Sequence, residues 1–578
     1  MRRNHRIILT ILIILFPALF IVQGLDLTDT GFHLARVSNF IKQQSGGIVW
    51  FSYFIGYIWD QVFGQLGLTG FKILSYILYE LTVWTVYFGF RKIYSQKYLL
   101  FYIFLGMLIT LSIKTFFFSY DNVSNLFLVL GSTLLLVGVL SKSRIKILLA
   151  GFIFALSAFS RLPDILSLGM IVLFPLYEFI KKYRLRDVWE SRFSWLKSTG
   201  LFLSGFLLGV SMVLVLIHLF GQLDRVMGAI GQTLNVFADS GGEGGHSATG
   251  MMSRQLESGK KMFNNAMLFV LLSLLFAWFI QHKKKGNLVL YYSLAGFGIA
   301  TVIFMRTDHD YFVNYVNIVT GAQIALALFF FLRILQVETR YRFALICGIA
   351  VMFVSFMGSD TGLLKSATGW FITIPLLILI FDELGDLQMR TEYKQSSRVW
   401  SISSSRMKAF LISVIILTSL LIRYVAIFGD EGSRHKMVHA VDVPGARGTL
   451  TTEGKAQGVQ VIYENLQKYI GKDDYLIGHG GGPLFIYLTG AKVYMPGTWI
   501  LWYNTANILP DLTEAYEKNG QLPVILMVDE EKFRTVFEDE KPEISKQRGE
   551  IHKFMEPYDF VQVVKEEDYE IWVPANRI

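Results

Sequence analysis

The stretch LDLTDTGFHLAR, residues 25–36, follows directly on the first membrane-length apolar run of the chain, residues 7–22. It brings two carboxylates, one imidazole and one guanidinium close to an expected bilayer edge: Asp26, Asp29, His33 and Arg36. Ionisable groups at such a boundary are rare, costly and often functional. Two interpretations are open from the spacing alone. The charges either end a helix in a solvated loop, or they include a carboxylate that faces a cavity at the outer membrane face and takes part in chemistry.

The composition places this stretch in a membrane protein. Of the 578 residues, 53% are hydrophobic and 17% are charged, whereas an average soluble protein has roughly 25% charged residues. Apolar runs recur as far as residue 428, which predicts a polytopic α-helical membrane protein. Most basic residues behind the net charge of +9 lie in short connections between the runs. This pattern sets topology and attracts lipid headgroups, and it does not indicate nucleic acid. The single cysteine excludes an intramolecular disulfide and a cysteine-based metal site.

Run lengths and basic residues together predict about thirteen spans, the first of them an uncleaved helix. The expected spans are residues 7–23, 70–90, 97–113, 123–140, 146–160, 165–180, 199–220, 265–281, 287–305, 313–332, 343–357, 366–382 and 409–428. Arginines precede the first span, so we expect a cytoplasmic N-terminus. Residues 48–66 are aromatic and rich in glycine, and we expect two short interfacial helices there. Counting that segment as a span would place the basic residues 283–285 outside the cell.

The odd number of spans places residues 429–578 outside the cytoplasm. This tail is polar and alternates between helix and strand signals, which predicts a small α/β domain beside a transmembrane domain of residues 1–428. The expected helices are 456–470, 484–489 and 511–518, and the expected strands are 475–477, 492–495, 523–528, 559–564 and 569–573. The glycine-rich residues 478–482 lie between a strand and a helix. They do not fit a dinucleotide fingerprint, because residue 483 is proline.

In this topology the polar residues of the external loops gather at one membrane face. They are Asp26, Asp29, His33, Arg36, Tyr120, Asp121, Arg161, Asp164, Arg306, Asp308, His309, Asp310 and Asp360. A channel would need polar groups through the whole depth of the membrane, and these spans are mostly apolar. The pattern therefore favours chemistry or binding at the outer face. A polytopic transporter or flippase and a non-catalytic assembly component are the competing hypotheses. The long external loop 221–263 is interpreted either as a flexible flap over the site or as a plain disordered loop.

The N-terminal part of the chain resembles the GT-C superfamily of membrane glycosyltransferases. Asp29-Thr30-Gly31-Phe32-His33-Leu34 stands where the superfamily carries the acidic motif of its first external loop. Residues 63–67 and 71–75 resemble the segment that leads into the next span. The likeness is to the bacterial relatives of protein mannosyltransferases and of the aminoarabinose transferase. It covers the expected architecture of the whole chain, with about thirteen spans and an external α/β tail, but the local sequence only within about residues 1–180. The adjacent Asp-Glu pair of those relatives is absent, as is the Trp-Trp-Asp motif of oligosaccharyltransferases.

This resemblance implies a transferase in the bacterial plasma membrane that moves a sugar from a polyprenyl-phosphate donor to an extracytoplasmic glycan, lipid or protein. A lipid phosphate leaves as a stable anion, so the enzyme needs a base for the acceptor and a cation for the phosphate. Asp29 is the expected base, and Arg161 and Arg306 are candidates for the phosphate. Asp121 would either bind Mg²⁺ or Mn²⁺ together with Asp29 or orient the acceptor, and no other cofactor is expected. The remaining expected substrate-binding residues are Asp26, His33, Arg36, Tyr120, Asp308 and His309.

Overall fold

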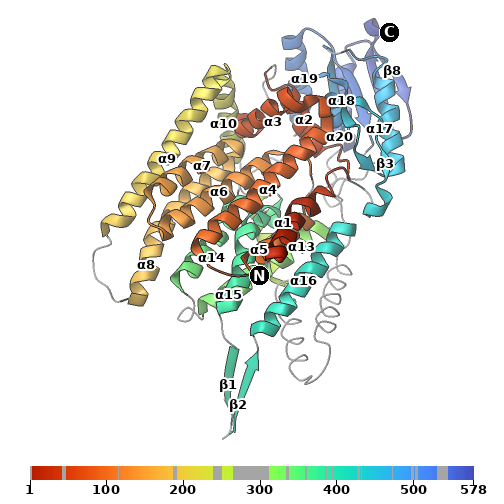
Figure 1. Ribbon diagram of the computed structural model, residues 1–578. Coiled ribbons are helices and arrows are strands. Elements are labelled where there is room, and N and C mark those ends of the chain that lie inside the picture. Colours follow the sequence, from red (N-terminus) through yellow and green to blue (C-terminus); the bar gives the residue numbers. More distant parts are fainter. Residues whose placement is uncertain are drawn as a thin grey trace.

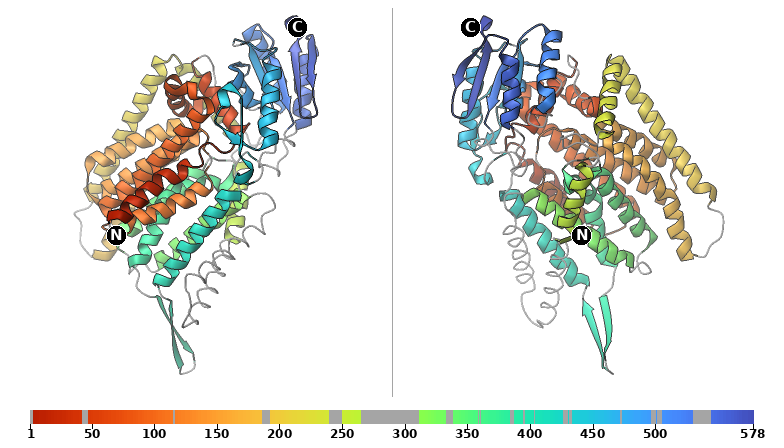
Figure 2. Two further views of the ribbon diagram at one scale, coloured as in Figure 1. Left: turned by 45° about the vertical axis from the view of Figure 1, so that its right-hand side comes forward. Right: turned by 180° about the vertical axis from the view of Figure 1, so that it is seen from behind.

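The computed structural model describes residues 3–41, 47–114, 116–185, 192–238, 250–264, 311–332, 338–357, 359, 361–383, 387–393, 396–402, 404–425, 430, 433–471, 473–495, 500, 505–529 and 544–578. In this part of the chain, long helices form an elongated bundle, and a sheet with its covering helices lies over one end of that bundle (Figure 1). A thin β-hairpin projects from the opposite end (Figures 1 and 2).

The bundle consists of apolar helices that follow the expected spans closely. They are α1 (Arg3–Ala18), α4 (Gly67–Ile93), α5 (Leu99–Ser112), α6 (Tyr120–Leu140), α7 (Arg144–Ser160), α8 (Leu173–Leu185), α9 (Arg192–Leu219), α13 (Tyr311–Leu332), α14 (Thr339–Phe356), α15 (Trp370–Glu383) and α16 (Ser404–Val425). Two 3₁₀ segments, η3 (Leu162–Val172) and η5 (Gly362–Gly369), lead into α8 and α15. Seven segments within the described residues are long and apolar enough to cross a membrane. The chain is thus an integral membrane protein. The number thirteen stays a prediction, because the expected spans 265–281 and 287–305 lie outside the described residues.

Small residues bring neighbouring helices of the bundle close together. A Cβ atom on Gly151 of α7 would lie 2.0 Å from the backbone oxygen of Phe202 in α9. A Cβ atom on Gly205 of α9 would lie 1.9 Å from the backbone oxygen of Leu148. Glycine at both positions lets the two helix backbones meet, which is how membrane helices associate where the lipid supplies no hydrophobic driving force. Phe154 and Phe202 pack beside this contact, with ring centroids 5.8 Å apart.

Short helices lie at the end of the bundle that the sheet covers (Figure 1). Helix α2 (Asp29–Ser38) contains the acidic motif, and α3 (Trp50–Phe63) continues through a 3₁₀ turn at Gly64–Leu66 into α4. The two short helices expected over residues 48–66 are therefore one helix with a 3₁₀ turn at each end. Gly67 begins α4 with a positive φ of 55°, a conformation that glycine adopts without steric cost. The chain thereby turns from α3 into the bundle.

The expected long loop at residues 221–263 is in part a wrong prediction. Residues 223–238 form α10 (Leu223–Ala238), and residues 250–264 are helical as well. Apolar residues recur along α10 at helical spacing, and Val226 of this helix is buried, so the loop-length argument missed an amphipathic helix. The glycine-rich residues 239–249, on which the flap interpretation rested, lie outside the described residues. A second unexpected element is the antiparallel hairpin of β1 (Leu387–Tyr393) and β2 (Ser396–Ile402).

The C-terminal region, which we define as residues 433–578, contains a five-stranded mixed sheet with the strand order β6-β5-β7-β9-β8. Its strands are β6 (Lys492–Val493), β5 (Tyr475–His479), β7 (Val524–Val528), β9 (Tyr569–Pro574) and β8 (Phe560–Lys565), and its helices are α17 (Glu453–Leu466), α18 (Pro483–Thr489), α19 (Thr505–Asn519) and α20 (Ile544–Met555). Strands β6, β5 and β7 are parallel, whereas β9 and β8 are antiparallel additions. The expected α/β elements are all present, and α20 was not predicted. The expected domain boundary between residues 428 and 429 stays a prediction.

One hydrophobic core joins the C-terminal region to the short helices. Leu27 and Leu34 from the α2 segment belong to the same buried cluster as Leu484, Phe485 and Val459 of the C-terminal region. Each of these side chains is at most 1% exposed. Helix α18 of the C-terminal region is therefore packed directly against α2, the helix that bears the acidic motif. This contact fixes the surroundings of the site described next.

Candidate functional site

Asp26 lies just before α2, and its carboxylate is turned toward that helix. Its oxygens accept hydrogen bonds from the Thr30 backbone N–H at 2.5 Å and from the Thr28 hydroxyl at 2.9 Å. Burial raises the pKa of Asp26, while the bond from Thr30 and the positive charge of Lys455 oppose that rise. The first backbone N–H groups of a helix have no acceptor within the helix, and the Asp26 carboxylate supplies one for Thr30. Asp26, expected to bind substrate, is thus placed to hold the start of α2.

Asp29, His33 and Arg36 share one face of α2, because residues three and four apart on a helix are neighbours. His33 is only 4% exposed, and its Nδ1 lies 3.0 Å from the hydroxyl of Tyr53 in α3. The negative charges of Asp29 and Asp121 both act on that hydroxyl. The two acids, 92 positions apart in sequence, therefore flank the same His33–Tyr53 pair.

His33 is a neutral group in this site. Burial lowers its pKa to about 3, and the nearby charges of Arg36 and Lys365 act in the same direction while Asp121 opposes them. The ring lies between aromatic neighbours, parallel to Phe117 at 6.2 Å and edge-on to Tyr120 at 5.2 Å between centroids. A neutral imidazole that is bonded to a tyrosine hydroxyl orients its neighbours and is not a proton shuttle near neutral pH.

The neutrality of His33 predicts a pH dependence of stability. A histidine with a lowered pKa binds its proton more readily in the unfolded chain, so its contribution is complete above about pH 6.5 and is lost as the pH falls toward about 3. Between pH 7.5 and pH 5 the loss is about 2 kcal/mol. His33→Asn keeps a polar atom near the Nδ1 position and does not titrate. Thermal unfolding in detergent at the two pH values should show a smaller loss for the variant; equal losses would contradict the assignment.

Asp121 lies in the first turn of α6 and forms a salt bridge with Lys365 of η5. The two side chains are 22% and 24% exposed, so this pair is accessible while most charged groups nearby are buried. Lys365 also lies 5.9 Å from the centre of the Tyr120 ring. Sequence reasoning placed Tyr120 and Asp121 at the site but missed Lys365, which arrives from a segment more than 240 positions away.

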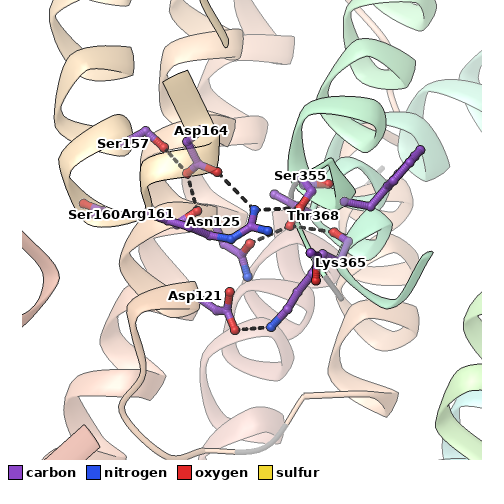
Figure 3. A network of polar contacts seen from close by, with 12 residues as sticks. Asp121, Asn125, Ser157, Ser160, Arg161, Asp164, Ser355, Lys365 and Thr368 are labelled. Atoms are coloured by element: carbon purple, nitrogen blue, oxygen red, sulfur yellow. Dashed lines mark hydrogen bonds and ion pairs between the residues drawn. The ribbon is translucent and has the colours of Figure 1, made fainter. Parts of the chain in front are cut away.

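Arg161 takes part in a buried network behind this pair (Figure 3). Its Nη1 donates to Asp164 Oδ1 at 3.2 Å and to the backbone oxygen of Ser355 in α14 at 2.7 Å. The second oxygen of Asp164 accepts from the Ser124 and Ser157 hydroxyls at 2.5 and 2.6 Å. The Arg161 side chain is 7% exposed. The network therefore ties η3 to α6, α7 and α14, and the guanidinium expected to hold phosphate is directed into the protein.

A pocket with three cations lies next to the first turn of α2. Lys72 of α4, Arg423 of α16 and Arg434 line it together with Asp26, Thr30, Phe20 and Phe117. Lys72 Nζ donates to the backbone oxygen of Gly24. Arg423 Nη1 donates to Leu111 O at 3.2 Å, and Arg434 Nη1 donates to Gln23 Oε1 at 3.1 Å.

Three basic side chains and one carboxylate, that of Asp26, therefore line the pocket. Carbonyl oxygens accept the hydrogen bonds of the three basic groups, and in the described part of the chain none of these groups forms a salt bridge. Burial lowers the pKa of Arg434 only to about 10, so it stays charged at neutral pH. The buried Nε of Arg423 has no hydrogen-bond partner among the described residues. An unpaired buried donor is costly, and an anion in the pocket would satisfy it.

The cationic pocket and the acidic cluster meet at the segment that leads into α6. Phe117 lines the pocket and lies parallel to the His33 ring. Lys114 donates from Nζ to Asn122, and its backbone oxygen accepts from Arg423. Burial lowers the pKa of Lys114 to about 8, Asp121 opposes this, and Arg423 adds to it. Acids, a neutral imidazole and basic side chains thus lie side by side at one end of the bundle.

Asp29 and Asp121 are the pair for which the sequence left a divalent cation open. Among the described residues, no three His, Cys, Asp or Glu side chains lie close enough to hold a metal ion. A cation at Asp121 would also have to displace Lys365. The described residues by themselves therefore do not complete a metal site, and metal dependence stays a prediction.

The structure brings together five of the expected site residues: Asp29, His33, Arg36, Tyr120 and Asp121. Arg36 lies over the Phe32 ring, with its guanidinium carbon 4.2 Å from the ring centre. Arg306, Asp308, His309, Asp310 and Asp360 lie outside the described residues. The residues that sequence reasoning missed are Tyr53, Lys365, Arg423, Arg434 and, as a site residue, Lys72. Ionisable groups inside otherwise apolar helices are the signal that could have identified Lys72 and Arg423.

No protein-family model and no curated protein matches the sequence. Among solved structures, ArnT from Cupriavidus metallidurans in the apo state is similar at 10% identity, with a TM-score of 0.42 over 98% of this chain and 97% of that one. The archaeal oligosaccharyltransferase AglB from Archaeoglobus fulgidus, in complex with an inhibitory peptide and a dolichol-phosphate, is similar at 11% identity, with a TM-score of 0.43 over 92% of this chain and 69% of that one. Both are GT-C glycosyltransferases, the superfamily that the N-terminal sequence resembles. At these identities and TM-scores the likeness assigns no activity to this chain.

Proposed function

We propose that this protein is a membrane glycosyltransferase that moves a sugar from a polyprenyl-phosphate donor to an extracytoplasmic acceptor. One observation carries the proposal: Asp29 begins α2, and the next residue of that helix, Thr30, lines a pocket together with Lys72, Arg423 and Arg434. A reaction that needs a base next to a leaving phosphate would use both parts of this arrangement. The resemblance of residues 29–34 to the GT-C acidic motif supports the same assignment.

The proposed step is a direct displacement at the anomeric carbon. The Asp29 carboxylate takes the proton of an acceptor hydroxyl or amine, and the acceptor atom forms the new bond to the sugar. The bond between the anomeric carbon and the phosphate oxygen breaks, and its electron pair leaves with the lipid phosphate. Asp121, held by Lys365, would orient the acceptor, and neutral His33 would hold Tyr53 between the two acids.

The three cations of the pocket would hold the donor phosphate. Charge-assisted hydrogen bonds from lysine and arginine to phosphate are about twice as strong as neutral ones. Lys72 and Arg434 can redirect hydrogen bonds from their carbonyl acceptors to an incoming anion. The N–H at Nε of Arg423 has no acceptor among the described residues and could donate to the same anion. Arg161 would serve the site by fixing η3 against α14, because its guanidinium already binds Asp164 and Ser355. A phosphate contact by Arg306 stays a prediction.

Consumption of a lipid-linked sugar tests the proposal. Membranes that contain the protein would be incubated with a panel of radiolabelled polyprenyl-phosphate sugars, and membranes with the Asp29→Asn variant would be the control. We expect one donor to lose its label to a membrane or envelope acceptor in the parent sample only. A panel that stays intact in both samples would count against the glycosyltransferase assignment.

The proposal also requires the site to face away from the cytoplasm. The hairpin β1–β2 and the C-terminal region lie at opposite ends of the bundle (Figure 2), as the basic residues predict. Reporter fusions after Arg91 and Lys284 should report a cytoplasmic location, and a fusion after Ile578 should report an external one. A cytoplasmic signal at Ile578 would contradict the proposed active site.

A further inference from the structure

The segment that leads into α2 is hydrogen-bonded along its backbone to the C-terminal region. The N–H of Leu450 donates to the oxygen of Val22 at 2.8 Å, and the N–H of Gly24 donates to the oxygen of Leu450 at 2.9 Å. The N–H of Leu484, in α18, donates to the oxygen of Leu27 at 3.1 Å. Residues 22–27 are therefore held like an added strand between the bundle and the sheet region. Such a ladder fixes backbone position more strictly than side-chain packing does.

Asp430 lies beneath the same segment. Its Oδ2 accepts the Leu25 N–H at 2.9 Å and the Thr451 hydroxyl at 2.6 Å. Its other oxygen lies 3.6 Å from Lys455 Nζ of α17, with both side chains at most 6% exposed. The charge of Lys455 also acts on Asp26, which caps α2. A buried lysine of the C-terminal region thus compensates both carboxylates that hold the start of this helix.

Helix α2 itself touches α18 without an intervening side chain. A Cβ atom on Gly31 would lie 2.1 Å from the backbone nitrogen of Leu484 and 2.5 Å from its Cα. Both are backbone atoms and cannot rotate away. Glycine at position 31 therefore permits a contact that no other residue allows. Asp29 is two residues away on the same helix.

We infer that the C-terminal region, with Asp430, is a positioning element of the active site: it sets the place of Asp29 through the backbone of residues 22–31. This inference rests on the proposed function in so far as Asp29 is the base. A base misplaced by about 1 Å can cost about 100-fold in rate even when the fold is intact. Gly31 and Asp430 act through Asp29 and are positioning residues.

Two variants test the inference, each with a matched control. Gly31→Ala forces α2 and α18 apart, and Asp430→Asn leaves one amide oxygen for Leu25 and Thr451 while its amide group faces Lys455. Gly454→Ala is the control for the first, because a Cβ there meets nothing within 4 Å. Asp442→Asn is the control for the second, because its ion pair with Arg447 is about 70% exposed and worth little.

The first readout is amide hydrogen exchange of the full-length protein over residues 22–36, which needs no substrate. We expect at least tenfold faster exchange in Gly31→Ala and Asp430→Asn, and parent rates in both controls. Parent-like exchange in the two variants would overturn the inference. Hydrogen exchange does not depend on sugar transfer. It therefore tests whether the C-terminal region holds residues 22–31 in place even if the protein consumes no lipid-linked sugar.

The second readout separates turnover from binding. With the polyprenyl-phosphate sugar that the parent consumes, kcat should fall at least tenfold in both variants, while the Kd for polyprenyl phosphate changes less than threefold. A folding defect would lower the bound fraction instead, so the two effects are distinguishable. Faster exchange with an unchanged kcat would show that the anchoring does not position the base, and the inference would fail. A parent that consumes no lipid-linked sugar would refute the proposed function alone.

Discussion

Replacing Asp29 by Asn should stop sugar transfer while the chain stays folded and inserted in the membrane. Asn has nearly the same shape and lacks the charge, so the site loses its base and little packing. Loss of a positioned base slows a reaction by about 10²–10⁴-fold. Asp29 lies in the first turn of α2, where a negative charge stabilises a helix by about 0.3–1 kcal/mol, so stability should fall by less than about 1 kcal/mol. The rate of polyprenyl phosphate release and the thermal midpoint in detergent measure the two effects.

Asp26→Asn is the matched comparison, because Asp26 is a neighbouring carboxylate with a different task. Its oxygens accept bonds from Thr28 and Thr30 at the start of α2, and the variant places an amide group against that buried network. We expect a stability loss of about 1–3 kcal/mol and measurable transfer wherever the variant is folded. If Asp26→Asn were inactive and Asp29→Asn active, the general base would be Asp26 and not Asp29. Full activity in both variants would contradict the proposed mechanism.

Lys72→Gln should weaken the binding of polyprenyl phosphate by about 10–100-fold. A hydrogen bond to a charged group contributes about 1.5–3 kcal/mol, and each factor of ten in affinity corresponds to about 1.4 kcal/mol. Gln keeps a donor for the Gly24 oxygen, so the loop beside Lys72 retains its contact. The affinity would be measured by titrating fluorescent polyprenyl phosphate into the purified protein.

Lys92→Gln, at the other end of the same helix, is the control for that measurement. Lys92 is exposed and far along α4 from the pocket, so its replacement removes one positive charge without touching the expected phosphate position. Its affinity should equal that of the parent. Equal affinities in Lys72→Gln and the parent would place the phosphate elsewhere and leave the pocket without its proposed role.

The local part of the site could be predicted from the sequence because it depends on short spacings. Asp29, His33 and Arg36 share a helix face through the period of 3.6 residues, and Asp121 lies at the end of the short connection between two apolar runs. The cationic pocket depends on tertiary contacts instead. Lys72 and Arg423 are 351 positions apart, and each on its own is compatible with a long side chain that reaches the membrane surface.

The fold shows the same division. Apolar runs of membrane length predicted the positions of the bundle helices, because a helix that crosses a bilayer must be apolar along its whole length. The helix α10 was missed because its apolar residues are spaced over one face only. The contact of Gly31 with Leu484 was not predictable from local pattern, since it joins residues 453 positions apart. A glycine inside a short helix is the kind of sequence sign that could have indicated a close approach of another backbone.

The fate of a lipid-linked sugar in sealed liposomes tests the central claim most directly. The purified protein would be reconstituted and supplied with the polyprenyl-phosphate sugar and its acceptor, and mass spectrometry would quantify both lipid species in each leaflet. The account predicts that polyprenyl phosphate appears in step with the glycosylated acceptor, and that Asp29→Asn abolishes both. Movement of the intact lipid-linked sugar between leaflets, with no release of polyprenyl phosphate, would contradict the account and identify a flippase instead.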